Sequence, residues 1–213
     1  MAKIYLVRHA ESIANTQGIY QGITYDTGLS QRGKTQAKAL AARFCNVAID
    51  SITSSSLKRT YDTAACVAAV KGIPHVHIEE SIKETNHGEW EGKSKNEIMK
   101  RWPKLYRKWE KFPSRVSFPS GERFVDTQRR VLLWWRTFCT SDSGNTLIVT
   151  HDNIVRIIVG SVLHMKLNKI WSFHLQPTAV TEIEIVSGEP HIRTLNDAHH
   201  IGTSQVNLAA HAL

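Results

Sequence analysis

Short apolar runs alternate with longer stretches of helical periodicity along most of this chain. The first run, residues 4–7, reads Ile-Tyr-Leu-Val, a composition typical of a buried strand. A second run of the same kind lies within residues 145–149. Between such runs, apolar residues recur at helical spacing, as they do at residues 31–44. Strands that alternate with helices in this way predict βαβ units and a parallel sheet.

The other elements follow from the same periodicities and from turn residues. Pro103 is expected to split residues 93–115 into two short helices, the first opened by a capping box of Ser94 and Glu97. Residues 202–213 are mildly apolar and have no clear assignment. The remaining expected strands are residues 49–53 and 75–78 and a hairpin of 180–186 and 191–195, and the remaining expected helices are 57–71, 154–165 and one that begins near 122.

These elements predict one domain, residues 1–213. We expect a three-layer α/β/α sandwich with a mostly parallel central sheet, helices on both faces, and a small helical cap inserted at about residues 84–121. The 213 residues and the 41% hydrophobic content suit a single globular core. No apolar run approaches the roughly 20 residues that span a bilayer, and the start of the chain does not look like a signal peptide. We therefore expect a cytoplasmic protein without membrane contact.

Charge and cysteine content narrow the chemistry. Three widely spaced cysteines without a CxxC pair argue against a disulfide framework and against a zinc site built on thiolates. The net charge of +8 favours anionic partners such as phosphorylated metabolites, nucleic acid or acidic surfaces. Residues 93–115 mix basic and aromatic side chains, as single-strand nucleic-acid platforms do. An amphipathic helix with its aromatic residues turned inward explains the same pattern better.

Arg8 and His9 follow directly after the first apolar run. Ligands of parallel sheets bind at the carboxyl ends of the strands. An imidazole can act as nucleophile or base near neutral pH, and a guanidinium matches phosphate oxygens. The pair therefore suggests a histidine that attacks phosphorus while an arginine holds the phosphoryl oxygens, although an ordinary strand end would read the same. His151 likewise follows the expected strand at residues 145–149, so a second histidine lies at the carboxyl end of a strand.

Further candidates for phosphate contact lie in the segments that follow. Arg59 falls in the first turn of the helix 57–71, where the helix dipole already favours an anion. Asn15 precedes a glycine-containing loop, residues 16–30, and Gln21 lies within it; both carry amides suited to phosphate oxygens. Simple turn chemistry is the alternative for both amides.

Four motifs in order resemble the histidine phosphatase superfamily. They are LVRHAES with Arg8 and His9, Arg59 in SSSLKRTYDTA, Glu84 in IKETNHGEWEG, and His151 in LIVTHDNIVR, and the resemblance runs from about residue 3 to residue 197. Ala10 departs from the usual glycine and should be tolerated. The resemblance implies that His9 is the nucleophile and that Arg8, Arg59 and His151 hold the phosphoryl group.

The leaving group needs a proton, and three glutamates compete to supply it. Glu84 follows the strand 75–78 closely, as in the Glu-rich loop of the superfamily, whereas Glu91, next to Gly92, reads as structural. Glu89 is the second choice. Glu84 would then act as base when water attacks the phosphohistidine. The sequence has no cluster of aspartates that could bind magnesium. We therefore expect neither a metal nor a cofactor.

Within the superfamily the chain is most similar to the metal-independent phosphoserine phosphatases. The resembling stretches are residues 20–22, 58–61, 86–88 and 171–173. The resemblance implies that His87 recognises the substrate carboxylate and that the C-terminal segment helps to close the site. His87 could instead only stabilise its loop. Gly22 and Asp152 are further candidates for substrate contact, and Asp152 could equally cap the helix after it.

Three alternatives stay open at this point. Phosphoglycerate mutases share all four motifs, although the cofactor-dependent ones usually have a longer cap. A broad-specificity sugar or nucleotide phosphatase is the second, and a non-catalytic module that binds phosphate or RNA is the third. The expected partner is a small phosphorylated metabolite, without nucleic acid or membrane, in a possible homodimer.

Overall fold

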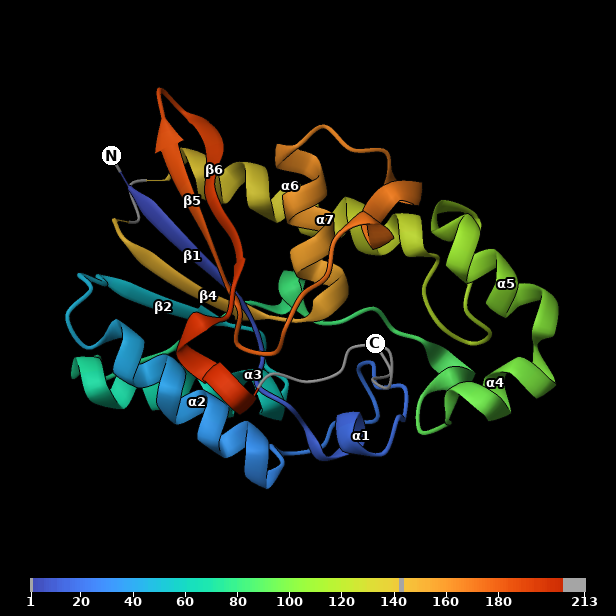
Figure 1. Ribbon diagram of the computed structural model, residues 1–213. Coiled ribbons are helices and arrows are strands. Elements are labelled where there is room, and N and C mark those ends of the chain that lie inside the picture. Colours follow the sequence, from blue (N-terminus) through green and yellow to red (C-terminus); the bar gives the residue numbers. More distant parts are fainter. Residues whose placement is uncertain (1, 142–143, 205–213) are drawn as a thin grey trace.

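One mixed sheet organises the molecule. The computed structural model describes residues 2–141 and 144–204. The strands are β1 (Lys3–Arg8), β2 (Ser51–Ser54), β3 (His77–Ile78), β4 (Thr146–Thr150), β5 (Val180–Val186) and β6 (Glu189–Asp197). Their order is β3-β2-β4-β1-β5-β6, with the first four mutually parallel and β5 antiparallel to both neighbours (Figure 1). The predicted mostly parallel sheet is confirmed.

Helices cover both faces of the sheet. Two of them, α2 and α3, pack on one face, and α6 and α7 pack on the other (Figure 1). The predicted three-layer α/β/α arrangement is therefore confirmed. The helices are α1 (Ile13–Thr16), α2 (Gln31–Phe44), α3 (Lys58–Lys71), α4 (Lys95–Arg101), α5 (Pro103–Lys111), α6 (Phe124–Thr140) and α7 (Asp152–Val162).

The alternation of side chains along β1 explains this layering. Successive side chains of a strand point to opposite faces of the sheet. Tyr5 and Val7 pack with the residues of α2 and α3, whereas Ile4 and Leu6 pack with those of α6 and α7. All four side chains are buried. A strand buried on both faces reads as a continuous apolar run, which is the pattern seen at residues 4–7.

Three predicted elements differ from the structure. The strand expected at 75–78 is only His77–Ile78, because this edge strand pairs with β2 through two residues and both its side chains are exposed. The helix expected at 154–165 is α7, which begins as soon as β4 ends, with His151 as its extended N-cap residue. The last strand, β6, is longer than the predicted 191–195 because it pairs along most of β5.

The segment 93–115 forms two helices, as predicted. Pro103 is the first residue of α5, a position where its missing N–H costs no hydrogen bond. Tyr106 and Trp109 are buried, and Trp109 packs edge-on against Phe118 with ring centroids 5.1 Å apart. The expected inward orientation is confirmed for these two rings but not for Phe112, which is exposed at the end of α5. That this segment acts as a cap over the site stays a prediction.

Two further expectations concern the membrane and the tail. Within residues 2–141 and 144–204, no helix is long and apolar enough to cross a membrane. The uncertain stretch 202–213 begins in a short 3₁₀ segment, His199–Ser204, and residues 205–213 lie outside the described residues.

Candidate active site

Two histidines meet at the carboxyl edge of the sheet. β1 and β4 are parallel neighbours, with Arg8 opposite Thr150, so the residues that follow them lie side by side. The backbone N–H of His9 donates to the Thr150 carbonyl at 2.8 Å. The rings of His9 and His151 lie 5.4 Å apart, centroid to centroid, and both are buried. The register of β1 with β4 thus brings together His9 and His151, which are 142 residues apart in the sequence.

The hydrogen bond of His9 decides which ring nitrogen can react. Nδ1 lies 2.7 Å from the carbonyl oxygen of Ala10, and because a carbonyl only accepts, Nδ1 must carry the proton. The lone pair of a neutral ring is then on Nε2. Burial lowers the pKa of His9 well below the ordinary value, and the positive charges of Arg59 and Arg8 lower it further. His9 is therefore a neutral ring at pH 7.

Arg8 and Arg59 bring two buried guanidinium groups to the same edge. Arg8 donates to the Leu175 carbonyl at 2.8 Å, and Arg59 pairs with Asp26 at 2.7 Å. Burial lowers the pKa of both groups, but a guanidinium keeps its proton in proteins. The Nε atoms of both are buried without a hydrogen-bond partner among the described residues. Buried donors normally have partners, so these two suit an anion's oxygens.

His151 has one ring nitrogen engaged and one without a partner. Its Nε2 lies 2.7 Å from the Ser55 hydroxyl, whereas Nδ1 is buried and has no partner in the described part of the chain. Burial, with the nearby charge of Arg59, holds the pKa of His151 well below its usual range. When Ser55 donates to Nε2 of this neutral ring, Nδ1 carries the proton and can donate to a phosphoryl oxygen.

Glu84 is a carboxylate whose charge acts on both of these arginines. It is buried, and its Oε1 accepts a hydrogen bond from the Thr85 N–H at 2.8 Å. Its negative charge acts on both Arg8 and Arg59, after the larger effects of burial and of their Asp partners, to raise the pKa of each. The structure therefore brings the acid candidate and the two cations into one electrostatic neighbourhood.

The sequence profile of the histidine phosphatase superfamily (branch 1) matches residues 4–198. The chain belongs to this superfamily. It is 36% identical over 203 residues to phosphoserine phosphatase 1 of Hydrogenobacter thermophilus, and the match covers 95% of each chain. It is 29% identical over 195 residues to an adenosylcobalamin/alpha-ribazole phosphatase of Salmonella typhimurium, covering 91% of this chain and 96% of the relative.

A solved structure gives the same picture at the level of the fold. A mutant phosphoserine phosphatase from Entamoeba histolytica, in complex with phosphoserine, superposes with a TM-score of 0.82 at 26% identity. The match covers 94% of this chain and 99% of that one. Together with the curated relatives, this identifies the protein as a phosphatase of the histidine phosphatase superfamily.

The two competing glutamates of this histidine phosphatase have other partners. Glu89 forms an exposed ion pair with Arg101 at 2.8 Å. The carboxylate of Glu91 instead accepts backbone hydrogen bonds from Ile23 at 3.1 Å and His87 at 3.0 Å, which ties two loops together. A Cβ atom at Gly22 would lie 2.0 Å from this carboxylate and 2.9 Å from the Thr85 carbonyl oxygen, so a side chain there would displace the carboxylate. The structural interpretation of Glu91 thus has direct support.

The amides predicted to contact phosphate are held by nearby side chains. The Oδ1 atom of Asn15 accepts from the backbone N–H of Ser12 at 3.0 Å, in a reciprocal capping box that opens α1. Gln21 donates to the Ser12 hydroxyl at 2.8 Å and accepts from Thr27 at 3.2 Å. The turn chemistry considered for both is therefore present, and their contact with phosphate stays a prediction.

The three predicted substrate contacts also bind protein groups. The Gly22 carbonyl accepts from Arg59 at 3.1 Å. Asp152 is buried between two cations, 3.0 Å from Arg8 and 2.6 Å from Arg156. His87 is buried and has both ring nitrogens near protein partners, which favours the alternative that it stabilises its loop. Direct contact of these residues with substrate stays a prediction.

Sequence reasoning missed two residues that support the site. Ser55 is the partner of His151. Its position directly after β2, the strand beside β4, is the signal that could have found it. Arg130 of α6 donates to the carbonyls of Ser81, Lys83 and Glu84, each at 2.8 Å. It thereby holds the backbone of the loop that carries the candidate acid.

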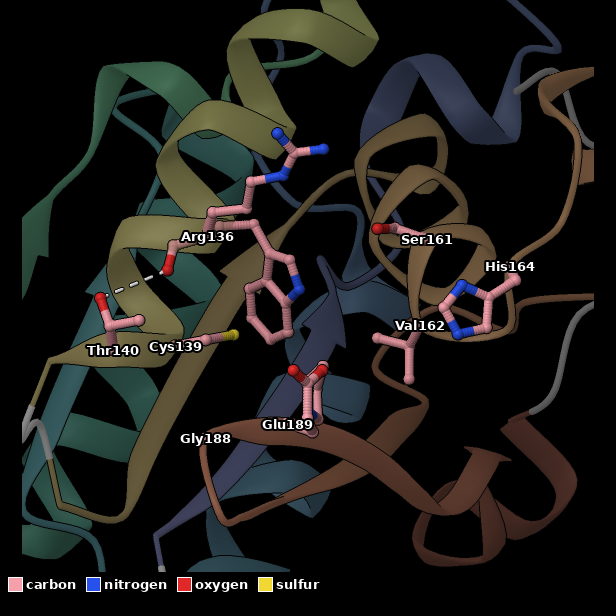
Figure 2. A pocket seen from close by; sticks show the side chains of 10 residues that line it. Arg136, Cys139, Thr140, Ser161, Val162, His164, Gly188 and Glu189 are labelled. Carbon is pink, nitrogen blue, oxygen red and sulfur yellow. Dashed lines mark hydrogen bonds between the residues drawn. The ribbon is translucent and has the colours of Figure 1, made fainter.

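A separate cavity of about 390 Å³ lies at the other end of the sheet. Figure 2 shows Arg136 and Cys139 of α6 on one side of it and Glu189, the first residue of β6 after the β5–β6 turn, below. That turn follows the part of β5 that pairs with the start of β1, so the cavity is opposite the edge where His9 lies. Burial raises the pKa of Cys139 to about 12, so its thiol stays protonated at neutral pH.

Proposed function

We propose that this phosphatase hydrolyses small phosphomonoesters through a phosphohistidine at His9. The observation that carries the proposal is the hydrogen bond from Nδ1 of His9 to the Ala10 carbonyl, which leaves the Nε2 lone pair as the nucleophile. Three buried polar atoms without protein partners in the described chain support it, because they suit the oxygens of a phosphoryl group: Arg8 Nε, Arg59 Nε and His151 Nδ1.

The reaction follows from the roles of these groups. Nε2 of His9 forms a bond to phosphorus while the bond from phosphorus to the leaving oxygen breaks, and Glu84 gives that oxygen its proton. Water then attacks the phosphohistidine, the carboxylate of Glu84 takes the water's proton, and the P–N bond breaks to release phosphate and neutral His9. The two guanidinium groups offset the charge of the transferring phosphoryl oxygens in both steps.

We expect activity on a phosphomonoester to survive excess EDTA. The two arginines and His151 supply the positive charge and the donors that a magnesium ion provides in other phosphatases. Within the described residues, no three His, Cys, Asp or Glu side chains lie together in a way that could hold a metal ion. Hydrolysis should be measured with and without EDTA at constant ionic strength. Loss of activity that added Mg²⁺ restores would contradict the proposed scheme.

L-Phosphoserine is the substrate we propose. The support is the 36% identity to a relative named phosphoserine phosphatase and the likeness to a phosphatase solved with phosphoserine. The positive charge of the chain also suits a small anion that bears a carboxylate besides its phosphate: residues 93–115 hold nine of the 27 lysines and arginines. A ribazole phosphatase is similar at 29% identity, so a nucleotide-like ester is the natural comparison substrate.

We expect the unmodified protein to hydrolyse L-phosphoserine with a kcat/KM at least roughly 100-fold higher than that for phosphoethanolamine, which lacks the carboxylate. A site with fixed charges discriminates strongly against a ligand that leaves them unpaired. Initial rates on both esters and on an aryl phosphate give the comparison. Equal rates on L-phosphoserine and phosphoethanolamine would contradict the phosphoserine assignment and would indicate a broad-specificity phosphatase.

A further inference from the structure

Asn153 is a buried amide beside the candidate acid that the proposed reaction does not use. It is the second residue of α7, and its side chain packs against the loop that follows Glu84. Its Nδ2 lies 3.3 Å from the Thr85 hydroxyl oxygen and 3.3 Å from Nε2 of His87. Its Oδ1 is buried and has no hydrogen-bond partner among the residues that the structure describes.

The partners of His87 fix the orientation of this amide. Nδ1 of His87 lies 2.5 Å from the Gln21 carbonyl oxygen, so Nδ1 carries the ring proton. In a neutral ring Nε2 is then an acceptor, and the group of Asn153 that faces it must be the NH₂ donor. The opposite orientation would set Oδ1 against the lone pair of Nε2. The amide oxygen is therefore turned away from His87.

A buried acceptor without a partner is costly, and native proteins seldom keep one without a reason. The side chain that carries this acceptor links two parts of the site. Asn153 follows His151 and Asp152 in the chain, and its amide contacts Thr85, the residue next to Glu84. The amide thus lies beside the loop that carries Glu84, the proposed proton donor to the leaving alcohol. A hydrogen-bond donor on that alcohol would complete it.

We propose that Asn153 is a specificity-determining residue whose Oδ1 accepts a hydrogen bond from the amino group of the substrate's alcohol half. His87 is then a positioning residue, which holds the amide with its oxygen outward, rather than a direct carboxylate contact. This inference rests on the proposed function, because phosphoserine carries an ammonium on the carbon next to its ester carbon. It concerns recognition only and leaves the phosphohistidine chemistry unchanged.

Three carboxylate-bearing esters test the inference on the unmodified protein. L-Phosphoserine has an ammonium, 3-phosphoglycerate a hydroxyl, and the phosphate ester of 3-hydroxypropanoate only hydrogen at that position. We expect kcat/KM to fall in this order, by roughly 10- to 100-fold from the first to the last, the usual effect of losing a charge-assisted hydrogen bond. Equal values for the first and the last would overturn the inference, whatever the behaviour of any variant.

The variant Asn153→Ala should remove this preference. We expect its kcat/KM on L-phosphoserine to fall by roughly 10- to 100-fold, while the value on the 3-hydroxypropanoate ester changes by less than about threefold. Asn168→Ala is a matched control, because Asn168 is an asparagine whose side-chain oxygen already accepts a backbone N–H, that of Ser114 at 3.0 Å. The control should keep the ranking of the three esters.

His87 is tested by a conservative replacement. His87→Gln keeps an acceptor for the amide of Asn153, so we expect it to retain more of the ammonium preference than His87→Ala. An equal fall of Asn153→Ala on all three esters would show a merely structural role and overturn the inference. Absence of phosphoserine hydrolysis with intact aryl phosphatase activity would overturn the substrate proposal as well. If the unmodified protein formed no phosphoenzyme from an aryl phosphate, that result would instead count against the proposed reaction itself.

Discussion

Replacement of His9 by alanine should abolish turnover and the trapping of an acid-labile phosphoryl group on the protein. The residue places the reactive Nε2 lone pair beside the buried donors of Arg8, Arg59 and His151. No other group takes over when a covalent nucleophile is removed, so we expect kcat to fall by roughly 10⁴-fold or more. Rapid quench with a ³²P-labelled ester, followed by comparison of acid- and base-treated protein, measures the intermediate directly.

His191→Ala is a suitable control for this experiment, because His191 is an exposed residue of β6 and should leave turnover and labelling unchanged. Phosphoenzyme that still accumulates in His9→Ala would show that another residue is the nucleophile. His151 would be the next to test, since its ring lies 5.4 Å from that of His9 and its lowered pKa also leaves it neutral at pH 7.

The layers of this fold and the edge that carries the site could be predicted from the sequence. The run at residues 4–7 is apolar on both faces, and only a central strand covered by helices on both sides has that pattern. Parallel strands that end together bring their following residues to one edge. His9 and His151 each follow a predicted strand of this kind, and the register of β1 with β4 is what brings them together.

One supporting residue, Arg130, could not be found in this way, for a physical reason. Arg130 acts on the carbonyl oxygens of Ser81, Lys83 and Glu84, and a backbone carbonyl is present at every position of every sequence. Such a contact leaves no pattern of residue types. It depends on how α6 packs beside the loop, 46 residues earlier in the chain, and only a three-dimensional structure gives that arrangement.

The same limit applies to residues with more than one plausible partner. His87 and Asp152 are polar residues next to predicted site positions, and their types suit a substrate carboxylate or an ammonium. The structure supplies protein partners that the sequence does not indicate, namely the Gln21 carbonyl for His87 and Arg156 for Asp152. Residue type restricts the chemistry that a side chain can do, and packing decides which partner it has.

Replacement of Glu84 by glutamine should slow the hydrolysis of alkyl phosphates by roughly 10²- to 10⁴-fold, the usual contribution of a general acid or base. Glutamine keeps the size of the side chain and its acceptor for the Thr85 N–H, but it cannot give a proton to the leaving oxygen. An aryl phosphate has a leaving group that needs little protonation. Its first step, the formation of phosphoenzyme, should therefore suffer much less.

The two steps must be measured separately, because Glu84 is proposed to act in both. Rapid quench gives the rate of phosphoenzyme formation, and the decay of isolated phosphoenzyme gives the rate of the water attack. Glu89→Gln is the matched control, since Glu89 pairs with Arg101 at the surface. In Glu84→Gln the aryl phosphate should form phosphoenzyme quickly and then accumulate it, because the base for water is missing. If instead both esters lose phosphoenzyme formation equally, Glu84 is not the proton donor, and the control at Glu89 becomes the next candidate.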